Sequence, residues 1–140
     1  MTKTILFLCR HNSCRSQMAH GWAELLAAEA GLSVRVLSAG SEPAPGVNPT
    51  AIEVMREVGA DISANRPRLL TPELLAQADV VVAVCGEEAC PNVPGALYWG
   101  IEDPTGGPTG DFRETRRVIR ERVAALLSTL NEGPGIRGKT

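Results

Sequence analysis

A short apolar run near the start of the chain leads directly into a tight polar loop and then into a helical pattern. Residues Ile5–Leu8 are apolar throughout, as expected of a strand that is buried on both faces. Residues 9–16 read CRHNSCRS, and residues 16–30 then place apolar side chains at helical spacing. A strand that turns at once into a helix is the opening unit of a parallel α/β sheet. No other part of the sequence restricts the fold as strongly.

Strands and helices alternate along the rest of the chain. Apolar and β-branched runs predict further strands at residues 34–37, 80–84 and 96–99. Helical spacing and N-terminal start signals predict further helices at residues 48–59, 71–78 and about 111–130. This alternation predicts a single α/β domain over residues 1–140, with helices on both faces of a parallel sheet. Residues 131–140 are expected to form a frayed tail. The arginines of the last helix are expected to form a solvated face: Arg116, Arg117, Arg120 and Arg122.

Composition and charge exclude several classes of function. The formal net charge of -2 argues against nonspecific binding to nucleic acid or to a membrane. No run approaches the 18 or so apolar residues of a membrane span, and the N-terminal apolar run is too short for a signal peptide. We therefore expect a cytoplasmic protein, in which thiols stay reduced. No large apolar surface stripe is evident, so we expect a monomer. The four cysteines are then reactive or metal-binding rather than structural: Cys9, Cys14, Cys85 and Cys90.

The loop at residues 9–16 has the chemistry of an oxyanion site. Backbone N–H groups of a tight loop and of a helix N-terminus converge on one spot, where anions bind. Arg15 can hold a tetrahedral oxyanion with its planar fork, and Cys9 can attack the atom at the centre of that oxyanion. The alternative is an inert, buried Cys9 with Arg15 on a solvated helix face. The candidate substrate-binding residues are Arg10, His11, Asn12, Ser13, Cys14, Arg15 and Ser16.

Several residues of this loop have two possible roles. Asn12 and Ser13 suit a backbone with unusual dihedral angles. His11 either influences the thiol or is an exposed loop side chain, and the second is the simpler interpretation. Ser16 can hydrogen-bond a thiolate or cap the helix. Cys14 is more simply a small apolar side chain than a reactive one.

Asp103 follows the predicted strand at residues 96–99 and so lies at the same edge of the sheet as the loop. An oxygen that leaves a tetrahedral oxyanion departs more easily once it is protonated, and a carboxylic acid above the site can supply that proton. The alternative is an exposed aspartate that forms a turn before Pro104.

Cys85 and Cys90 follow the predicted strand at residues 80–84, at the edge where Cys9 lies. Reduced thiols this close to Cys9 suggest a disulfide relay. Residues five apart on a regular helix have Cα atoms roughly 8–9 Å apart, whereas a disulfide needs about 4.4–6.8 Å. We therefore expect the connecting segment to be a mobile loop, or a helix that unwinds when the bond forms. A zinc site made of all four cysteines is the competing interpretation, but no C-x2-C pair is present.

Together these motifs resemble the thioredoxin-coupled arsenate reductases, which share the fold of the low-molecular-weight protein tyrosine phosphatases. The resemblance covers residues 3–130. Its motifs are CRHNSCRSQMA at 9–19, GW at 21–22, SAG at 38–40, GVNP at 46–49, the cysteine pair and WGIEDP at 99–104. It implies a four-stranded parallel sheet in the order 2-1-3-4, with helices on both faces.

The resemblance also implies a mechanism. Cys9 attacks arsenate while Asp103 protonates the departing oxygen. Cys85 then attacks Cys9, arsenite leaves, and Cys90 takes over Cys85. Thioredoxin reduces the resulting Cys85–Cys90 disulfide. No bound cofactor or metal is expected, since the electrons come from a thioredoxin-like dithiol protein.

This chain departs from the family pattern in two ways. Four residues separate Cys85 from Cys90, where the family commonly has six. Some members bind potassium through acidic residues at positions that match His20 and Arg68, so no specific potassium dependence is expected here.

Two other functions fit parts of the pattern. A low-molecular-weight protein tyrosine phosphatase would act through a phosphorylated Cys9, but one Tyr and two Phe leave little material for the aromatic walls that hold tyrosine. A redox or arsenic sensor would use the thiols without turnover. Such a sensor would have no use for the proton donor Asp103.

Overall fold

The computed structural model describes residues 2–86 and 90–136 of the chain. The helices and strands of the described residues are β1 (Lys3–Cys9), α1 (Arg15–Ala30), β2 (Val34–Gly40), α2 (Pro49–Arg56), α3 (Pro72–Gln77), β3 (Val80–Ala83), β4 (Leu97–Tyr98) and α4 (Thr109–Ile136). All the predicted elements are therefore present. The last helix is longer than predicted: α4 continues through Ile136, into the segment that was expected to be frayed.

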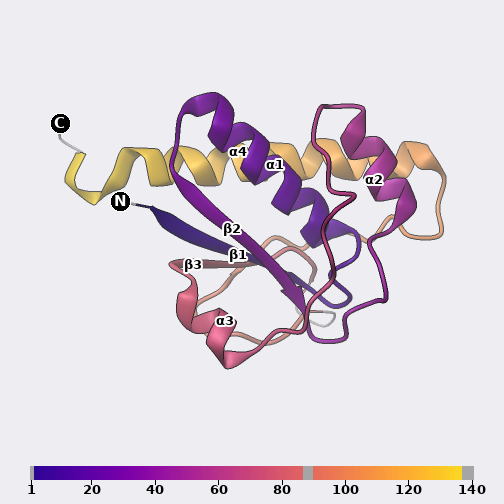
Figure 1. Ribbon diagram of the computed structural model, residues 1–140, viewed down its shortest axis with the longest axis horizontal. Coiled ribbons are helices and arrows are strands. Elements are labelled where there is room, and N and C mark those ends of the chain that lie inside the picture. Colours follow the sequence, from indigo (N-terminus) through magenta and orange to yellow (C-terminus); the bar gives the residue numbers. More distant parts are fainter. Residues whose placement is uncertain (1, 87–89, 137–140) are drawn as a thin grey trace.

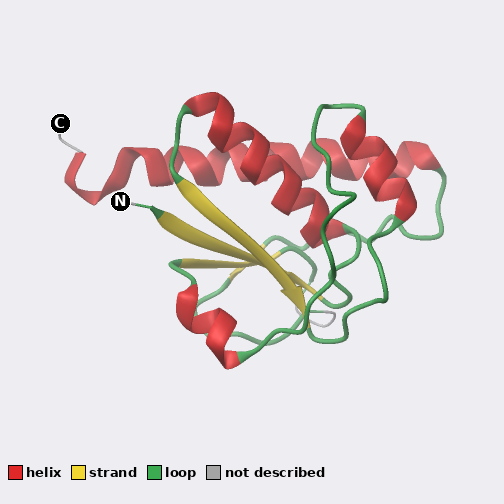
Figure 2. Cartoon of the chain, in the orientation of Figure 1, coloured by secondary structure: helices red, strands yellow, loops and turns green. Residues whose placement is uncertain are grey.

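The four strands form one parallel sheet in the order β2-β1-β3-β4, which confirms the expected topology. Cys9 at the end of β1 pairs with Gly40 at the end of β2, and Leu8 pairs with Ala83 at the end of β3. The carboxyl ends of the strands therefore lie at one edge. Figure 2 shows loops gathered at that edge, which is where ligands bind in sheets of this kind.

Helices cover the sheet on both faces: α1, α2 and α4 lie on one side and α3 on the other (Figure 1). Successive side chains of β1 point to opposite faces. Ile5 and Phe7 belong to the large core beneath α1 and α4, whereas Leu6 and Leu8 belong to a smaller core beneath α3. All four are fully buried, and each contributes about 1.5–3 kcal/mol of transfer free energy. This burial on both faces explains the continuous apolar run.

Local signals set the helix ends as predicted. The Asn48 side chain accepts hydrogen bonds from two backbone N–H groups at the start of α2, and Thr71 accepts one at the start of α3. Gly31 ends α1 in the left-handed conformation, with φ of 70°.

No helix of the described residues is long and apolar enough to cross a membrane.

The prediction that the arginines of α4 form a solvated face is wrong for Arg116. Its side chain is only 18% exposed. Nη1 donates hydrogen bonds to the Val54 carbonyl at 2.8 Å and to Glu57 at 2.7 Å. Arg116 therefore joins α2 to α4. Arg120 lies over the ring of Trp22, with its Cζ atom 5.6 Å from the ring centroid.

Candidate active site

The loop between β1 and α1 has an unusual backbone at Asn12, whose φ is 52°. Asparagine tolerates this left-handed conformation better than most residues. The buried side chain of Asn12 then holds the loop from inside. Its Nδ2 donates to Ser16 Oγ at 2.7 Å, and its Oδ1 accepts from the Arg68 backbone N–H at 3.0 Å. The predicted role of Asn12 in shaping the loop is confirmed.

The carbonyl groups of this loop are bonded to the segment at residues 42–48. The carbonyls of Arg10, His11 and Ser13 accept backbone hydrogen bonds from it at 2.8, 2.9 and 2.8 Å. In a trans peptide the N–H points opposite to the preceding carbonyl, so the N–H groups that follow these carbonyls point away from that segment. An anion inside the loop requires this orientation. Gly40 lies against the loop so closely that an added Cβ would be 2.5 Å from the Arg10 carbonyl oxygen.

Arg15 begins α1 and reaches across to the segment that follows β4. Its Nη1 donates to the Ile101 carbonyl at 2.7 Å, and its Nη2 lies 3.7 Å from Asp103 Oδ2. Its buried Nε has no hydrogen-bond partner among the described residues. Leaving a buried N–H unpaired costs about 1–3 kcal/mol, and an oxygen atom of a bound anion would remove that cost. The guanidinium thus brings Asp103 to the loop while one of its donors is still unpaired.

The Asp103 side chain is 44% exposed and forms a turn with Thr105, whose backbone N–H donates to Oδ1 at 3.0 Å. Burial acts to raise the pKa of this carboxyl group. Hydrogen bonds from Thr105 and the charge of Arg15 outweigh burial and hold the pKa below its ordinary value. Asp103 is therefore a carboxylate at neutral pH in the free protein. It turns the chain before Pro104, as one interpretation predicts, and it also lies beside Arg15. Its role as a proton donor stays a prediction.

Three sulfur atoms gather beside the loop. Cys9, Cys85 and Cys90 pack together with Ala83 and Tyr98, and we call this group the cysteine cluster. Cys85 and Cys90 form a disulfide, while Cys9 is a free thiol. Cys90 Sγ lies 3.8 Å from the Leu8 carbonyl oxygen, one residue before Cys9.

The Cα atoms of Cys85 and Cys90 are 5.6 Å apart, less than the roughly 8–9 Å of residues five apart on a regular helix. These two residues therefore do not lie on one regular helix in this state. The expected mobile loop or unwinding helix involves residues 87–89, which are outside the described residues.

Cys14 does not join the cysteine cluster, so the four-cysteine zinc site is not formed. It packs in the large core, as predicted for a small apolar side chain. Burial, with smaller contributions from the charges of Asp103 and Cys9, raises the pKa of the Cys14 thiol to about 12. This thiol is therefore protonated and unreactive at neutral pH.

Of the remaining candidate side chains, Arg10 and His11 lie at the exposed rim of the loop, whereas Ser16 is buried. Arg10 is exposed and pairs with Glu42, with Nε 3.2 Å from Oε1. The exposed ring of His11 contacts the Glu42 carbonyl, with Nδ1 2.9 Å from the oxygen. Ser16 accepts a hydrogen bond from Asn12 and lies inside α1. The possibility that Ser16 caps the helix is therefore wrong, because the N-cap position belongs to Cys14.

Sequence reasoning missed one residue of the cysteine cluster, Tyr98. Its hydroxyl donates to the Pro91 carbonyl at 3.1 Å and accepts from the Val93 N–H at 3.0 Å. Tyr98 thereby holds the segment that directly follows Cys90. The available signal was a lone tyrosine in a predicted strand at the carboxyl edge of the sheet.

Replacing Tyr98 with phenylalanine should therefore lower the free energy of unfolding by about 1–2 kcal/mol, because two hydrogen bonds are lost and the ring is kept. Urea unfolding of the disulfide-bonded protein measures this change. Leu97→Ala on the same strand is the control, since Leu97 is 47% exposed and should matter less. Equal stability of Tyr98→Phe and wild type would show that these bonds do not hold the segment.

Comparisons with known proteins agree with this geometry. The family model described as low molecular weight phosphotyrosine protein phosphatase matches residues 4–134. The chain is 42% identical over 129 residues to arsenate reductase 2 of Staphylococcus epidermidis, covering 89% of this chain and 95% of that protein. A solved structure of an arsenate reductase in the phosphate binding state has 38% identity and a TM-score of 0.78, covering 91% and 98% of the two chains. A low molecular weight protein tyrosine phosphatase from Bacillus subtilis has 27% identity and a TM-score of 0.79, covering 93% and 98%.

Proposed function

Because the chain belongs to the low molecular weight phosphotyrosine protein phosphatase family, we propose that it is the kind of member that reduces arsenate to arsenite. The observation that carries this proposal is the Cys85–Cys90 disulfide packed against the free thiol of Cys9. Of these three cysteines, hydrolysis of a phosphate ester requires only Cys9. The identity of 42% to a protein named arsenate reductase supports the same choice.

In the first step arsenate binds inside the loop at residues 9–15. Arg15 and the loop N–H groups hold its oxygen atoms, and the unpaired Nε of Arg15 gains an acceptor. Cys9 attacks arsenic, so that an S–As bond forms and an As–O bond breaks. The negative charge of arsenate favours uptake of a proton from the solvent by the Asp103 carboxylate, and Asp103 then gives that proton to the departing oxygen, which leaves as water.

In the second step Cys85 attacks the sulfur of Cys9. The S–As electron pair moves to arsenic, which is reduced from the +5 to the +3 state and leaves as arsenite. Cys90 then attacks Cys85 and releases Cys9 as a thiol. The observed state, with Cys9 free and Cys85 bonded to Cys90, is the expected end of this relay.

The oxidised protein must then recover two electrons. We assign this step to a thioredoxin-like dithiol protein, which exchanges thiols with the Cys85–Cys90 disulfide. The relay uses no bound cofactor or metal, and one chain supplies all three sulfurs. It requires a compartment in which thiols stay reduced, for which we propose the cytoplasm.

A coupled assay with thioredoxin, thioredoxin reductase and NADPH tests the proposal. We expect NADPH oxidation that depends on arsenate, with one arsenite formed for each NADPH consumed. Peptide mapping after a stoichiometric arsenate pulse should also find the Cys85–Cys90 disulfide in the wild type and a Cys9–Cys85 linkage in Cys90→Ser. The proposal is wrong if arsenate causes no oxidation while an aryl phosphate is hydrolysed rapidly, or if arsenite forms while every thiol stays free.

A phosphatase acting through a phosphorylated Cys9 is the second candidate function, since the loop and Asp103 suit phosphate esters equally well. The positions of the aromatic side chains argue against a tyrosine phosphatase. Phe7, Phe112, Trp22 and Trp99 are buried, and the hydroxyl of Tyr98 is bonded to the segment after Cys90. None of them forms an exposed wall for a tyrosine side chain. Weak hydrolysis of small aryl phosphates is still expected.

Replacing Asp103 with asparagine should slow the first step about 10²–10⁴-fold, because an amide cannot supply the proton. The rate of aryl phosphate hydrolysis measures this step without the relay. Glu102→Gln is the matched control, since it removes the same charge from an exposed neighbour. A rate for Asp103→Asn equal to that of the control would remove the role assigned to Asp103.

A further inference from the structure

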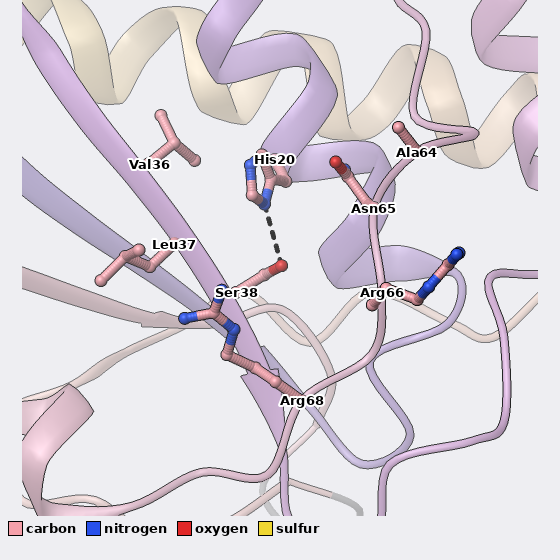
Figure 3. A pocket seen from close by; sticks show the side chains of 8 residues that line it. All are labelled: His20, Val36, Leu37, Ser38, Ala64, Asn65, Arg66 and Arg68. Carbon is pink, nitrogen blue, oxygen red and sulfur yellow. Dashed lines mark hydrogen bonds between the residues drawn. The ribbon is translucent and has the colours of Figure 1, made fainter.

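A cavity of about 300 Å³ lies between α1, β2 and the segment at residues 64–68. Figure 3 shows it beside the sheet, with side chains from all three elements around it. Its lining residues are His20, Val36, Leu37, Ser38, Ala64, Asn65, Arg66 and Arg68. None of residues 9–15 lines the cavity, and the arsenate mechanism does not use it.

The lining is cationic and rich in hydrogen-bond donors. It contains no carboxylate. In Figure 3 the Arg68 side chain extends along β2 toward Ser38, whereas the Arg66 side chain points away from the cavity. No described carboxylate forms an ion pair with the guanidinium of Arg68. A planar guanidinium that lines the same cavity as a hydroxyl group is suited to binding an oxyanion.

His20 adds a second polar group to this wall. Its Nδ1 lies 2.9 Å from Ser38 Oγ, and its Nε2 lies 3.3 Å from Glu24 Oε2. The hydrogen bond from His20 keeps the pKa of Glu24 below its ordinary value. Glu24 is thus a carboxylate that fixes the ring from the solvent side, and the other ring nitrogen faces Ser38.

The segment at residues 64–68 is held in place by hydrogen bonds to the loop at residues 9–15 and to α1. The Arg68 backbone N–H donates to Asn12 Oδ1 at 3.0 Å, and Asn65 Nδ2 donates to Gln17 Oε1 at 3.0 Å. Gln17 Nε2 in turn donates to the Asn12 carbonyl at 3.1 Å. Because these bonds hold the segment in place, little of it needs to be ordered on binding.

We propose that this cavity is a second anion site, separate from the loop at residues 9–15, for a small free oxyanion of the sulfate or phosphate type. Arg68 binds two of the oxygen atoms with its fork, and the Ser38 hydroxyl donates a hydrogen bond to a third while its oxygen stays paired with His20 Nδ1. The volume lies at the low end for ligand pockets, which suits a small ion rather than a nucleotide.

The two histidines of the chain allow each site to be observed separately. His11 lies in the loop at residues 9–15, and His20 lines the cavity. Imidazole resonances are followed by NMR while sulfate is added to the disulfide-bonded protein, with chloride keeping the ionic strength constant. We expect the resonances of both rings to shift and to saturate, each with its own dissociation constant.

Arg68→Gln should weaken the sulfate response of His20 about tenfold or more and leave that of His11 unchanged. Its backbone N–H can still bond to Asn12, so the loop should stay intact. Arg66→Gln is the matched control and should behave as wild type. A His20 resonance that does not respond to sulfate, or that responds equally in Arg68→Gln, overturns the proposal. No arsenate is involved, so this test is independent of the proposed reductase activity.

Discussion

Cys9→Ser should reduce both arsenate reduction and aryl phosphate hydrolysis to below about a thousandth of the wild-type rates. A serine hydroxyl is a far weaker nucleophile than a thiolate at neutral pH, and it cannot form a disulfide. The thioredoxin-coupled assay and an aryl phosphate assay measure the two losses. This change should have the largest effect of any single substitution, because both candidate reactions begin at Cys9.

A binding measurement separates lost chemistry from lost structure. Phosphate should still bind to Cys9→Ser, since Arg15 and the loop N–H groups are unchanged. Rapid turnover by this variant would exclude Cys9 as the nucleophile. Loss of phosphate binding would instead show that the substitution disturbs the loop itself.

Cys85→Ser and Cys90→Ser should each reduce thioredoxin-coupled turnover about as strongly as Cys9→Ser does. Both should leave aryl phosphate hydrolysis within about twofold of wild type. In the proposed mechanism hydrolysis uses Cys9 as the only cysteine, whereas reduction also needs Cys85 and Cys90. Preserved hydrolysis also shows that each variant is folded. Wild-type rates of coupled arsenate reduction in both variants would exclude the relay.

A single-turnover experiment should distinguish the two relay cysteines. Cys90→Ser can still complete one reduction and should then stall with Cys9 bonded to Cys85. Cys85→Ser should stall earlier, before arsenite leaves Cys9. Arsenite counted per enzyme should therefore be about one for Cys90→Ser and near zero for Cys85→Ser. The reverse order would mean that Cys90 attacks Cys9 first.

Much of the fold was predictable because its signals are local. The apolar run at Ile5–Leu8 predicts a strand buried on both faces, and each side chain is indeed buried against a helix layer. Asn48 and Thr71 start helices by bonding N–H groups two or three residues away. The strand order came from family resemblance, since no local pattern specifies which strands are neighbours.

The candidate site was predictable in its chemistry but not in its contacts. The spacing from Cys9 to Arg15 indicates an oxyanion loop, and Arg10 is one of the candidate binding residues in that loop. In the structure its side chain pairs with Glu42. The contact of Arg15 with Ile101 joins residues 86 positions apart in the sequence, and no periodicity reports on such a pair.

From the order of its residues alone, this chain specifies its strands and its helix caps, and it indicates the proposed nucleophile and the cysteines of the proposed relay. Each of these depends on residue type and on neighbours within a few positions. Three-dimensional packing adds the contact of Asp103 with Arg15, the hydrogen bonds of Tyr98 to the segment after Cys90, and the cationic cavity at Arg68. Those contacts join distant segments, and their geometry depends on how the helix layers close over the sheet.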